Sequence, residues 1–449
     1  MDQHPMRTAT AVVLGCGIAG LLAAAAACRH FDRVLIIERD DLPAMPAPRR
    51  GTPQSDHVHA LTDRGRREIS LLVPGFDARL AAAGAVTADF AAEVAIHGPA
   101  GRGAQFCHDL VATGATRELL EWVLRTEICR PPVSLAAGTV ATGLVMERDS
   151  VRAVRVSGAV HGEIEADLVI DATGRVSRVD RWLTESGYPA PTATIITAGL
   201  GYASRLYRIP FGHNADWRAC YIQAIPPQSR RGGVLMPVEG DRWLVTLIGA
   251  GHDRPTHNEE LFEYYARSLS SPMLADAIGA ATALTPVKVS TSTTSRRNRL
   301  ERLRRQPANL VRVGDAVVAF NPVYAQGMTA AALAAALLDR HLEYHVGGHR
   351  FAMRYHQALL WQLRWPWLMA ATADRRWLTA DPSPLHRYLD RVQACGTRDR
   401  DVQRVFLETL QMRSTPAKLF VPSVAARVLR DQWEFRTRRE SNEVQDVDC

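Results

Sequence analysis

The sequence predicts an α/β protein with an α+β insert and a helical C-terminal region. Three observations indicate this fold class. Residues 11–38 contain an apolar strand, a glycine-rich turn, a small-residue helix and a second apolar strand, the order of a Rossmann-like βαβ unit. Two later buried strands also end in glycine-containing turns, at 171–174 and 314–315. Between them, residues 190–290 contain strands separated by turn signals, which is typical of a mainly antiparallel sheet.

The first unit has the spacing of a dinucleotide-binding site. Gly15, Gly17 and Gly20 form the pattern Gly-x-Gly-x-x-Gly directly after the strand. We expect Gly15 to permit the tight turn, Gly17 to let the backbone approach a pyrophosphate, and Gly20 to let the helix pack closely on the strand. The second strand ends at Glu38, followed by Arg39, and an acid there accepts hydrogen bonds from an unphosphorylated ribose. The pattern alone does not separate NAD from FAD.

The remaining elements follow from changes in the hydrophobic period. Helical spacing of apolar residues predicts helices, alternation predicts hairpin strands, and short continuous apolar runs predict buried strands. In chain order, the sequence predicts a proline-rich loop at 42–50, helices near 62–72 and 115–130, a hairpin strand at 151–156, buried strands within 166–174 and 309–315, a helix at 328–342, and a helical region from about 350.

Composition excludes several classes of protein. The chain of 449 residues is too long for one compact core. Its net charge of +7 comes from 54 basic and 47 acidic residues, but no long basic patch or recognition motif is present, so no nucleic acid partner is expected. The arginine cluster within 296–305 is expected to be a solvated face before a strand. Seven cysteines without Cys-x-x-Cys spacing, and no pattern of a signal peptide or membrane span, predict a cytoplasmic protein.

The three strand-to-turn segments recur at intervals of about 150 residues, whereas an NAD-binding half needs only the first. The third continues as Gly-Asp-Ala-Val-Val-Ala-Phe-Asn-Pro-Val-Tyr-Ala-Gln-Gly-Met-Thr in 314–329, and Gly-x-Pro-Gln-x-x-His-x-His-x-Leu occupies 51–61. This combination resembles the FAD monooxygenases of the aromatic-hydroxylase fold. With the run Ala-Thr-Gly-Arg-Val-Ser-Arg at 172–178 and the segment 182–189, it is similar to the branch of squalene-epoxidase-like bacterial enzymes and polyether-ionophore epoxidases.

The resemblance covers most of the chain and implies a discontinuous domain organisation. The expected boundaries are an FAD-binding domain in three segments, 1–75, 111–190 and 289–345; a substrate domain formed by the segment 76–110 and the antiparallel sheet 191–288; and a helical C-terminal region, 346–449.

The resemblance also implies individual FAD contacts. Asp315 of the Gly-Asp motif would bind the ribityl chain, and Thr173 and Gly174 would lie near the diphosphate. Gln54 and Arg117 would make polar contacts with FAD. The cofactor contact is favoured for Arg117, because its flanking sequence matches the family, and the alternative is that Arg117 only caps or pairs on its helix surface.

The loop at 320–328 is expected to face the flavin. Backbone amides at Gly327 and Met328 open an alanine-rich helix, whose positive end can stabilise the anion that develops on the reduced flavin. Phe320, Asn321 and Pro322 would then lie along the isoalloxazine face.

For each of four positions, the sequence allows two interpretations of the role of the side chain. The family usually has glycine at the position of Ala325, and alanine is strained there if its φ is positive. Asp171 is either a ribose or backbone partner or a satisfied acid at a strand end. His57 and His59 have strand spacing, but a metal site needs further ligands, so a loop beside FAD is favoured and no metal is expected.

The resemblance implies monooxygenation. Reduced flavin activates O2 as a C4a-hydroperoxide, whose distal oxygen can be delivered to an alkene or an arene. We expect epoxidation of a lipophilic polyketide or terpenoid in antibiotic or other secondary metabolism, with hydroxylation of an aromatic substrate as the alternative. Electrons come from NAD(P)H directly or through a separate flavin reductase. The reductase is favoured because no second full Gly-x-Gly-x-x-Gly unit is present.

This chemistry requires an apolar pocket that excludes water. Its walls are expected from residues 195–250, from the segment 90–106 and from the loop at Pro322. Three tryptophans would either cover the pocket as a lid or pack between helices: Trp361, Trp365 and Trp367.

Other flavoprotein activities are weighed against this one. A flavin-dependent halogenase uses a lysine early in the chain and a Trp-x-Trp-x-Ile-Pro signature, but the lysines here are Lys288 and Lys418 and the signature is absent. A redox-neutral or reductive flavoprotein, such as a carotenoid-type cyclase or a prenyl reductase, stays open. A flavin-binding scaffold without catalysis would leave the flavin-facing loop unexplained.

Overall fold

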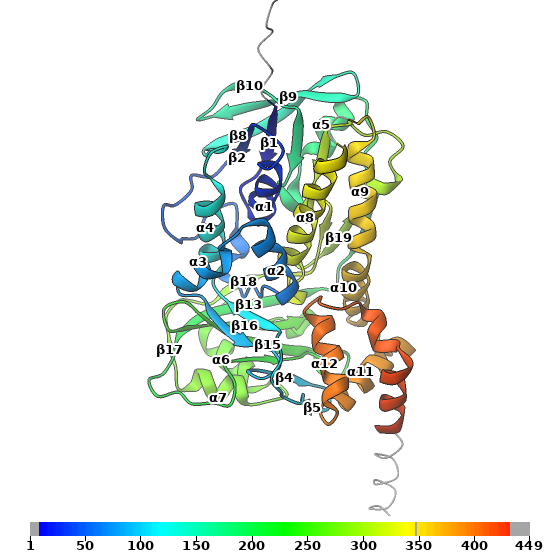
Figure 1. Cartoon of the computed structure of the whole chain (residues 1–449). Helices are drawn as coiled ribbons and strands as arrows, with labels where there is room; N and C mark the ends of the chain where they lie inside the picture. The colour runs from blue at the N-terminus through cyan, green and yellow to red at the C-terminus, as the bar shows by residue number, and fades with distance from the viewer. Residues whose placement is uncertain (1–8, 346–347, 432–449) are drawn as a thin grey trace, which may run out of the picture.

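The computed structural model describes residues 9–345 and 348–431. A five-stranded parallel sheet lies in the upper part of Figure 1, and an eight-stranded, mainly antiparallel sheet lies in the lower part. The C-terminal helices run down one side of the molecule to the lower sheet. These features confirm the predicted α/β fold with its antiparallel insert and helical C-terminal region.

The parallel sheet is assembled from segments that are far apart in the sequence. Each neighbouring pair is parallel, and most of the strands are short apolar runs, as expected for strands buried on both faces. The carboxyl ends of parallel strands meet at one edge, so this sheet brings the three glycine-containing turns together. The strand order is β20 (Leu310–Arg312), β11 (Leu168–Asp171), β1 (Thr10–Leu14), β2 (Arg33–Ile37) and β7 (Val133–Ala136).

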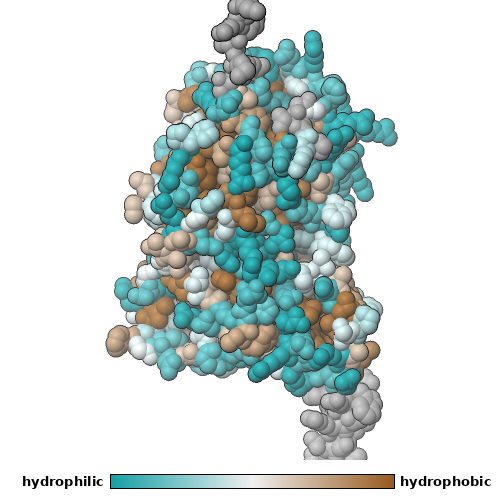
Figure 2. Space-filling model, in the orientation of Figure 1, coloured by the Kyte–Doolittle hydropathy of each residue, from teal (hydrophilic) through white to brown (hydrophobic). Residues whose placement is uncertain are grey.

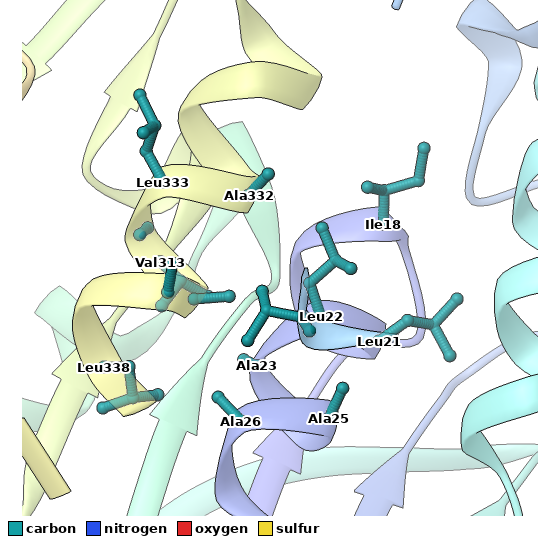
Figure 3. Close-up of a cluster of buried hydrophobic side chains, with 14 of the residues drawn as sticks. Ile18, Leu21, Leu22, Ala23, Ala25, Ala26, Val313, Ala332, Leu333 and Leu338 are labelled. Carbon is teal, nitrogen blue, oxygen red and sulfur yellow. The ribbon is translucent and has the colours of Figure 1, made fainter. Parts of the chain in front are cut away.

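Helices rich in small residues pack closely beside this sheet. A Cβ atom at Gly20 would lie 1.9 Å from the carbonyl oxygen of Gly15, so only glycine fits there. In Figure 3, Ala26 of α1 belongs to the same buried cluster as Leu333 and Leu338 of α8. The helices at this core are α1 (Ile18–Ala27), α2 (Asp63–Leu72), α4 (Arg117–Ile128) and α8 (Gly327–His345).

The antiparallel sheet carries two strands from the earlier part of the chain, β4 and β5. β4 pairs with β14 in parallel, so the region near residue 96 joins the inserted sheet. Two helices, α6 (Glu259–Arg267) and α7 (Met273–Gly279), share a buried apolar cluster with the sheet. The sheet comprises β17 (Thr282–Ala283), β13 (Leu200–Arg208), β16 (Arg242–Ala250), β15 (Arg231–Val238), β14 (Ala219–Ile222), β4 (Val94–Gly98) and β5 (Gly101–Arg102), with β18 (Lys288–Ser290) pairing with β13.

Three small sheets and two helices complete the two main parts. They are the meander β8 (Thr139–Glu147), β9 (Ser150–Gly158) and β10 (Gly162–Glu165); the sheet β12 (Ala193–Ile196), β19 (Ser295–Asn298) and β21 (Val318–Ala319); the pair β3 (Val86–Asp89) and β6 (Val111–Gly114); and the helices α3 (Phe76–Ala82) and α5 (Val179–Glu185).

The arginine cluster differs from the prediction of a solvated face. Arg296 and Arg297 are half-buried residues of β19, which pairs with β12 and β21. Arg296 donates to Asn298 at 3.0 Å, and Arg297 pairs with Glu301 at 3.1 Å. The prediction is therefore wrong for these two side chains, because they lie within a strand, β19 (Ser295–Asn298), that is paired on both sides.

The C-terminal region is helical, as predicted, and is held to the rest of the protein by a buried carboxylate. Asp63, at the start of α2, is fully buried and accepts hydrogen bonds from Arg67 at 2.8 Å and from Arg413 at 2.5 Å. The region contains α9 (Phe351–Gln362), α10 (Arg364–Arg376), α11 (Pro384–Gly396) and α12 (Arg400–Leu410).

The face of the molecule drawn in Figure 2 is mostly hydrophilic, with hydrophobic residues in small groups. Within the described ranges, no helix combines the length and the apolarity that a bilayer crossing requires.

Candidate functional site

One cavity of about 1660 Å³ runs from the edge of the parallel sheet to the inserted sheet and the C-terminal helices. A pocket for one drug-sized ligand occupies roughly 300–1,000 Å³, so this cavity has room for a large cofactor and a substrate together. Its lining includes residues from all three glycine-containing turns. The two ligands would therefore share one continuous space.

The first turn has the geometry of a phosphate-binding site. Gly15 has φ of +99°, which favours glycine, and its amide donates to the carbonyl of Ile37 at 2.8 Å. Gly17 is the N-cap of α1 and provides no side-chain cap, so the first amides of the helix are available to an anion. A Cβ at Gly17 would meet no protein atom closer than 3.9 Å, which leaves space on the cavity side. This turn fits a diphosphate.

Glu38 is buried at the end of β2 and borders the cavity. Its carboxylate accepts hydrogen bonds from the amides of Cys16 at 2.7 Å and Asp40 at 3.0 Å. These two bonds fix the orientation of the carboxylate beside the turn. Arg39 is exposed and also borders the cavity.

A buried ion network that the sequence analysis missed supports this end of the cavity. Arg49 donates to Asp40 at 2.9 Å and to Glu121 at 3.0 Å, and Arg117 donates to Glu121 at 2.9 Å. Burial alone would raise the pKa of Glu121, but Arg117 and Arg49 bring it below its usual value. Arg117 therefore pairs with Glu121 along its own helix and still borders the cavity, as does Gln54.

The second turn separates structural from cavity-facing groups. Asp171 is fully buried and accepts hydrogen bonds from the Thr173 hydroxyl at 2.6 Å and the Ser177 hydroxyl at 2.7 Å. It also accepts a hydrogen bond from the backbone amide of Thr173 at 3.1 Å, so the carboxylate is both a backbone partner and a satisfied acid at the strand end. Thr173 and Gly174 border the cavity, and Gly174 has φ of +78°.

The third turn brings Asp315 to the start of α8. The Asp315 side chain is 37% exposed and borders the cavity, and a Cβ at Gly327 would lie 4.0 Å from its Oδ1 atom. Arg175 donates to Asp315 at 3.2 Å and also to the carbonyl of Phe320. Burial raises the pKa of Asp315, and Arg175 opposes the rise. Arg175 directly follows the Ala-Thr-Gly turn, which is the signal that could have identified it.

The loop at 320–324 presents two of its three expected residues to the cavity. Phe320 and Pro322 border the cavity, as do Gly327 and Met328 at the start of α8. Asn321 differs from the expectation: it is fully buried and its amide donates to Asp374 at 2.8 Å. The side chain therefore supports the loop from behind, because the buried carboxylate needs donors.

Ala325 has φ of +53°, the left-handed conformation that alanine adopts at a cost. We expect Ala325→Gly to raise the free energy of unfolding by about 0.5 kcal/mol, because relief of about 1–2 kcal/mol of strain exceeds the entropy that glycine adds to the unfolded chain. Chemical denaturation measures the change. Ala336→Gly, inside α8, is the matched control and should lower stability by about 1 kcal/mol. Equal losses in both variants would show that Ala325 is not strained.

The two histidines lie in the loop beside the cavity. His57 bonds to the Ser204 hydroxyl at 2.8 Å, and His59 bonds through Nδ1 to the His57 carbonyl at 2.8 Å. Burial lowers the pKa of His57 to about 4 and that of His59 to about 3, so both are neutral at pH 7. Within the described ranges, no group of three histidine, cysteine, aspartate or glutamate residues could hold a metal ion.

The part of the cavity away from the turns is largely apolar. Trp365 borders it, whereas Trp367 is buried and Trp361 is 67% exposed, so the tryptophans do not act together as a lid. The sequence analysis missed the contribution of α11, α12 and the segment after them, since the helical period alone does not say which face meets a cavity. Apolar lining residues include Phe90, Val94, Ile96, Val234, Met236, Leu368, Met369, Leu385, Leu389, Phe406, Leu410, Leu419 and Phe420.

Comparison with known proteins identifies the cofactor. The model of a family described as the FAD binding domain matches residues 7–357. The chain belongs to this family. FAD is therefore the cofactor. The turns, the free amides at the start of α1 and Asp315 before α8 fit this group, which supplies the redox chemistry when it is bound.

Individual relatives cover nearly the whole chain. Protein Rv3254 of Mycobacterium tuberculosis is 31% identical over 393 residues, which are 84% of this chain and 82% of that protein. The flavin-dependent brominase Bmp2 matches 95% of this chain and 99% of its own, with a TM-score of 0.69 and 15% identity. PqsL of Pseudomonas aeruginosa, in complex with 2-aminobenzoylacetate, matches 89% of this chain and 100% of its own, with a TM-score of 0.62 and 16% identity. The two structures share the fold.

Proposed function

We propose that the protein is an FAD-dependent monooxygenase that epoxidises an alkene of a lipophilic polyketide or terpenoid, in the branch of the squalene-epoxidase-like and ionophore-epoxidase enzymes. The observation that carries this proposal is the apolar compartment that continues directly from the loop of Phe320 and Pro322. A lipophilic chain is stabilised by burial there, and the same walls exclude water from the reaction. The protein's own groups orient the substrate, and the redox step belongs to the cofactor.

The proposed contacts with FAD follow the three turns. Gly15 and Gly17, with Thr173 and Gly174, would hold the diphosphate, and Glu38 and Arg39 would lie at the adenosine end. Gln54 and Arg117 would bind polar groups of the cofactor, and Asp315 would accept hydrogen bonds from the ribityl chain. Gly327 and Met328 would direct the positive end of α8 to the flavin ring. Gly20 would act only through packing, because its added Cβ would strike Gly15.

Halogenation is disfavoured by the residues around the cavity. Lys288 is exposed on β18, and Lys418 is exposed after α12. Among the described residues, no lysine borders the cavity. A halogenase mechanism in which a lysine carries the halogen would therefore have no lysine beside the substrate.

An oxygen-uptake assay tests the proposal. The holoprotein, reduced chemically under argon and then mixed with air-saturated buffer and a lipophilic alkene, should consume O2 and form the oxygenated product. Product formation under argon would contradict the proposal and favour a cyclase or reductase. Adding NAD(P)H with and without a purified flavin reductase in the same assay determines the route of the electrons. We expect turnover to require the reductase.

Asp315→Ala should weaken FAD binding by about 10- to 100-fold, because a hydrogen bond to a charged group contributes about 1.5–3 kcal/mol. Titration of the apoprotein with FAD, followed by flavin fluorescence, measures the change. Asp276→Ala, at an exposed position of α7, is the control and should leave the affinity unaltered. Unchanged affinity in the Asp315 variant would remove the ribityl assignment.

A further inference from the structure

Among the polar side chains that border the largely apolar part of the cavity, three uncharged ones come from facing elements. Tyr221 and Gln223 lie two residues apart at β14 and its end, so they point to the same side. Gln393 borders the cavity from α11. Within residues 9–345 and 348–431, none of the three side chains makes a hydrogen bond to another protein group. Their hydrogen-bonding capacity is left for a ligand.

The two amides lie close together. A Cβ atom added to Gly98, in the turn between β4 and β5, would lie 3.0 Å from Gln393 Oε1 and 3.5 Å from Gln223 Oε1. A strand of the inserted sheet and a helix of the C-terminal region therefore bring their amides to one point. An amide both donates and accepts, so this pair can bind a hydroxyl or a carbonyl group.

Tyr221 links the amides to the loop beside the flavin site. Burial raises the pKa of Tyr221 to about 12, so its phenol stays neutral and can donate. Tyr221 and Tyr324 both border the cavity. Burial and Asp374 raise the pKa of Tyr324, and Tyr221 adds to that rise. The Tyr324 hydroxyl already has a hydrogen-bond partner, since it donates to Asp374 at 2.9 Å. The unused phenol is that of Tyr221.

The same compartment offers no unpaired cation. Among the described residues that line it from β4, β6, β14–β16 and α10–α12, the charged side chain is Arg376. Arg376 binds both carboxylate oxygens of Asp390, at 2.6 and 2.9 Å, and its Nε atom donates to the Pro226 carbonyl at 2.8 Å. A carboxylate ligand would lose its water without gaining a counter-ion.

Resting on the proposed function, we propose that the substrate is an uncharged, oxygenated lipid-like molecule, whose hydroxyl, carbonyl or amide group is bound by Tyr221, Gln223 and Gln393. These residues select against a plain hydrocarbon, which would leave them unpaired, and against a carboxylate, which would be buried without a cation. The three side chains thereby determine which part of the molecule is bound at this end of the compartment.

Binding to the oxidised holoprotein, where no turnover occurs, tests this selection. Farnesene, farnesol and farnesoic acid share one isoprenoid chain and differ in the terminal group. The binding affinity is measured by calorimetry and by the change in the flavin absorption spectrum. We expect farnesol to bind most tightly, farnesene less tightly and farnesoic acid least tightly. Tyr221→Phe and Gln223→Leu should each weaken the binding of farnesol about 3- to 10-fold and leave the affinity for farnesene unchanged. Tyr264→Phe, at an exposed position of α6, is the matched control.

Equal weakening of farnesol and farnesene in both variants would overturn the proposal, as would tighter binding of the acid than of the alcohol. Because binding is measured without reduction or O2, these outcomes are independent of the oxygen-uptake assay. Selective alcohol binding without oxygen uptake would overturn the proposed function alone. Oxygen uptake with unselective binding would overturn this inference alone.

Discussion

Gly20→Ala is expected to yield a protein that no longer retains FAD and is destabilised by about 3 kcal/mol, the upper range for overpacking a core. The added Cβ would lie 1.9 Å from the carbonyl oxygen of Gly15 and 3.4 Å from the Cβ of Ala172. Backbone cannot move aside as a flexible side chain can, so α1 must withdraw from the turn. The amides at its start then lose their position at the proposed diphosphate site. Chemical denaturation and FAD titration measure the two effects.

Gly279→Ala is the control for this change. Gly279 ends α7, and an added Cβ there would meet no atom within 4 Å. Restricting the unfolded chain should stabilise this variant by about 0.4–1 kcal/mol. A Gly20 variant that binds FAD as the natural protein does would show that the close contact between helix and turn is dispensable.

Asp374→Ala should lower the free energy of unfolding by about 3 kcal/mol and weaken FAD binding, because it removes a buried acceptor behind the loop at 320–324, which we propose faces the flavin. Asp374 is fully buried on α10 and accepts hydrogen bonds from Asn321, from Tyr324 and, at 2.5 Å, from Ser295. Burial raises the pKa of Asp374, and these donors oppose the rise. Without the carboxylate, the loop loses its anchor to the C-terminal region.

Asp374→Asn should recover most of the stability, since its carbonyl can still accept from Asn321 and Tyr324 and its amide can donate to Ser295. Asp381→Ala, at an exposed position before α11, should change stability by less than about 0.5 kcal/mol. If the Asp374 alanine variant were as stable as the Asp381 variant, the carboxylate would not anchor the loop.

Local sequence signals were sufficient for the parts of the site that are built locally. Gly15, Gly17 and Gly20 act within one turn, and their spacing predicts their packing roles without knowledge of the rest of the chain. The loop motif indicated that alanine would be strained at position 325 if its φ were positive, and Ala325 has φ of +53° in the structure. Four of the five strands of the parallel sheet were expected as short apolar runs, whereas the edge strand β7 (Val133–Ala136) was not.

Groups whose partners are distant in the sequence could not be predicted in the same way. Asp374 sits in an ordinary helical segment, and its donors come from positions 50 to 79 residues earlier. Arg49 lies in a proline-rich loop and finds Glu121 only through the fold. Tyr221 and Gln223 look like the alternation of any half-buried strand, and their role depends on α11 closing the cavity opposite them.

The origin of the oxygen atom in the product tests the central claim most directly. Reduced holoprotein and a neutral, oxygenated isoprenoid alkene are supplied with ¹⁸O2 in unlabelled water, and the product is analysed by mass spectrometry. The account predicts one ¹⁸O atom per product molecule and no label when the heavy isotope is supplied as water. Product that carries oxygen from water, or an isomerised or reduced product with no new oxygen, would contradict it.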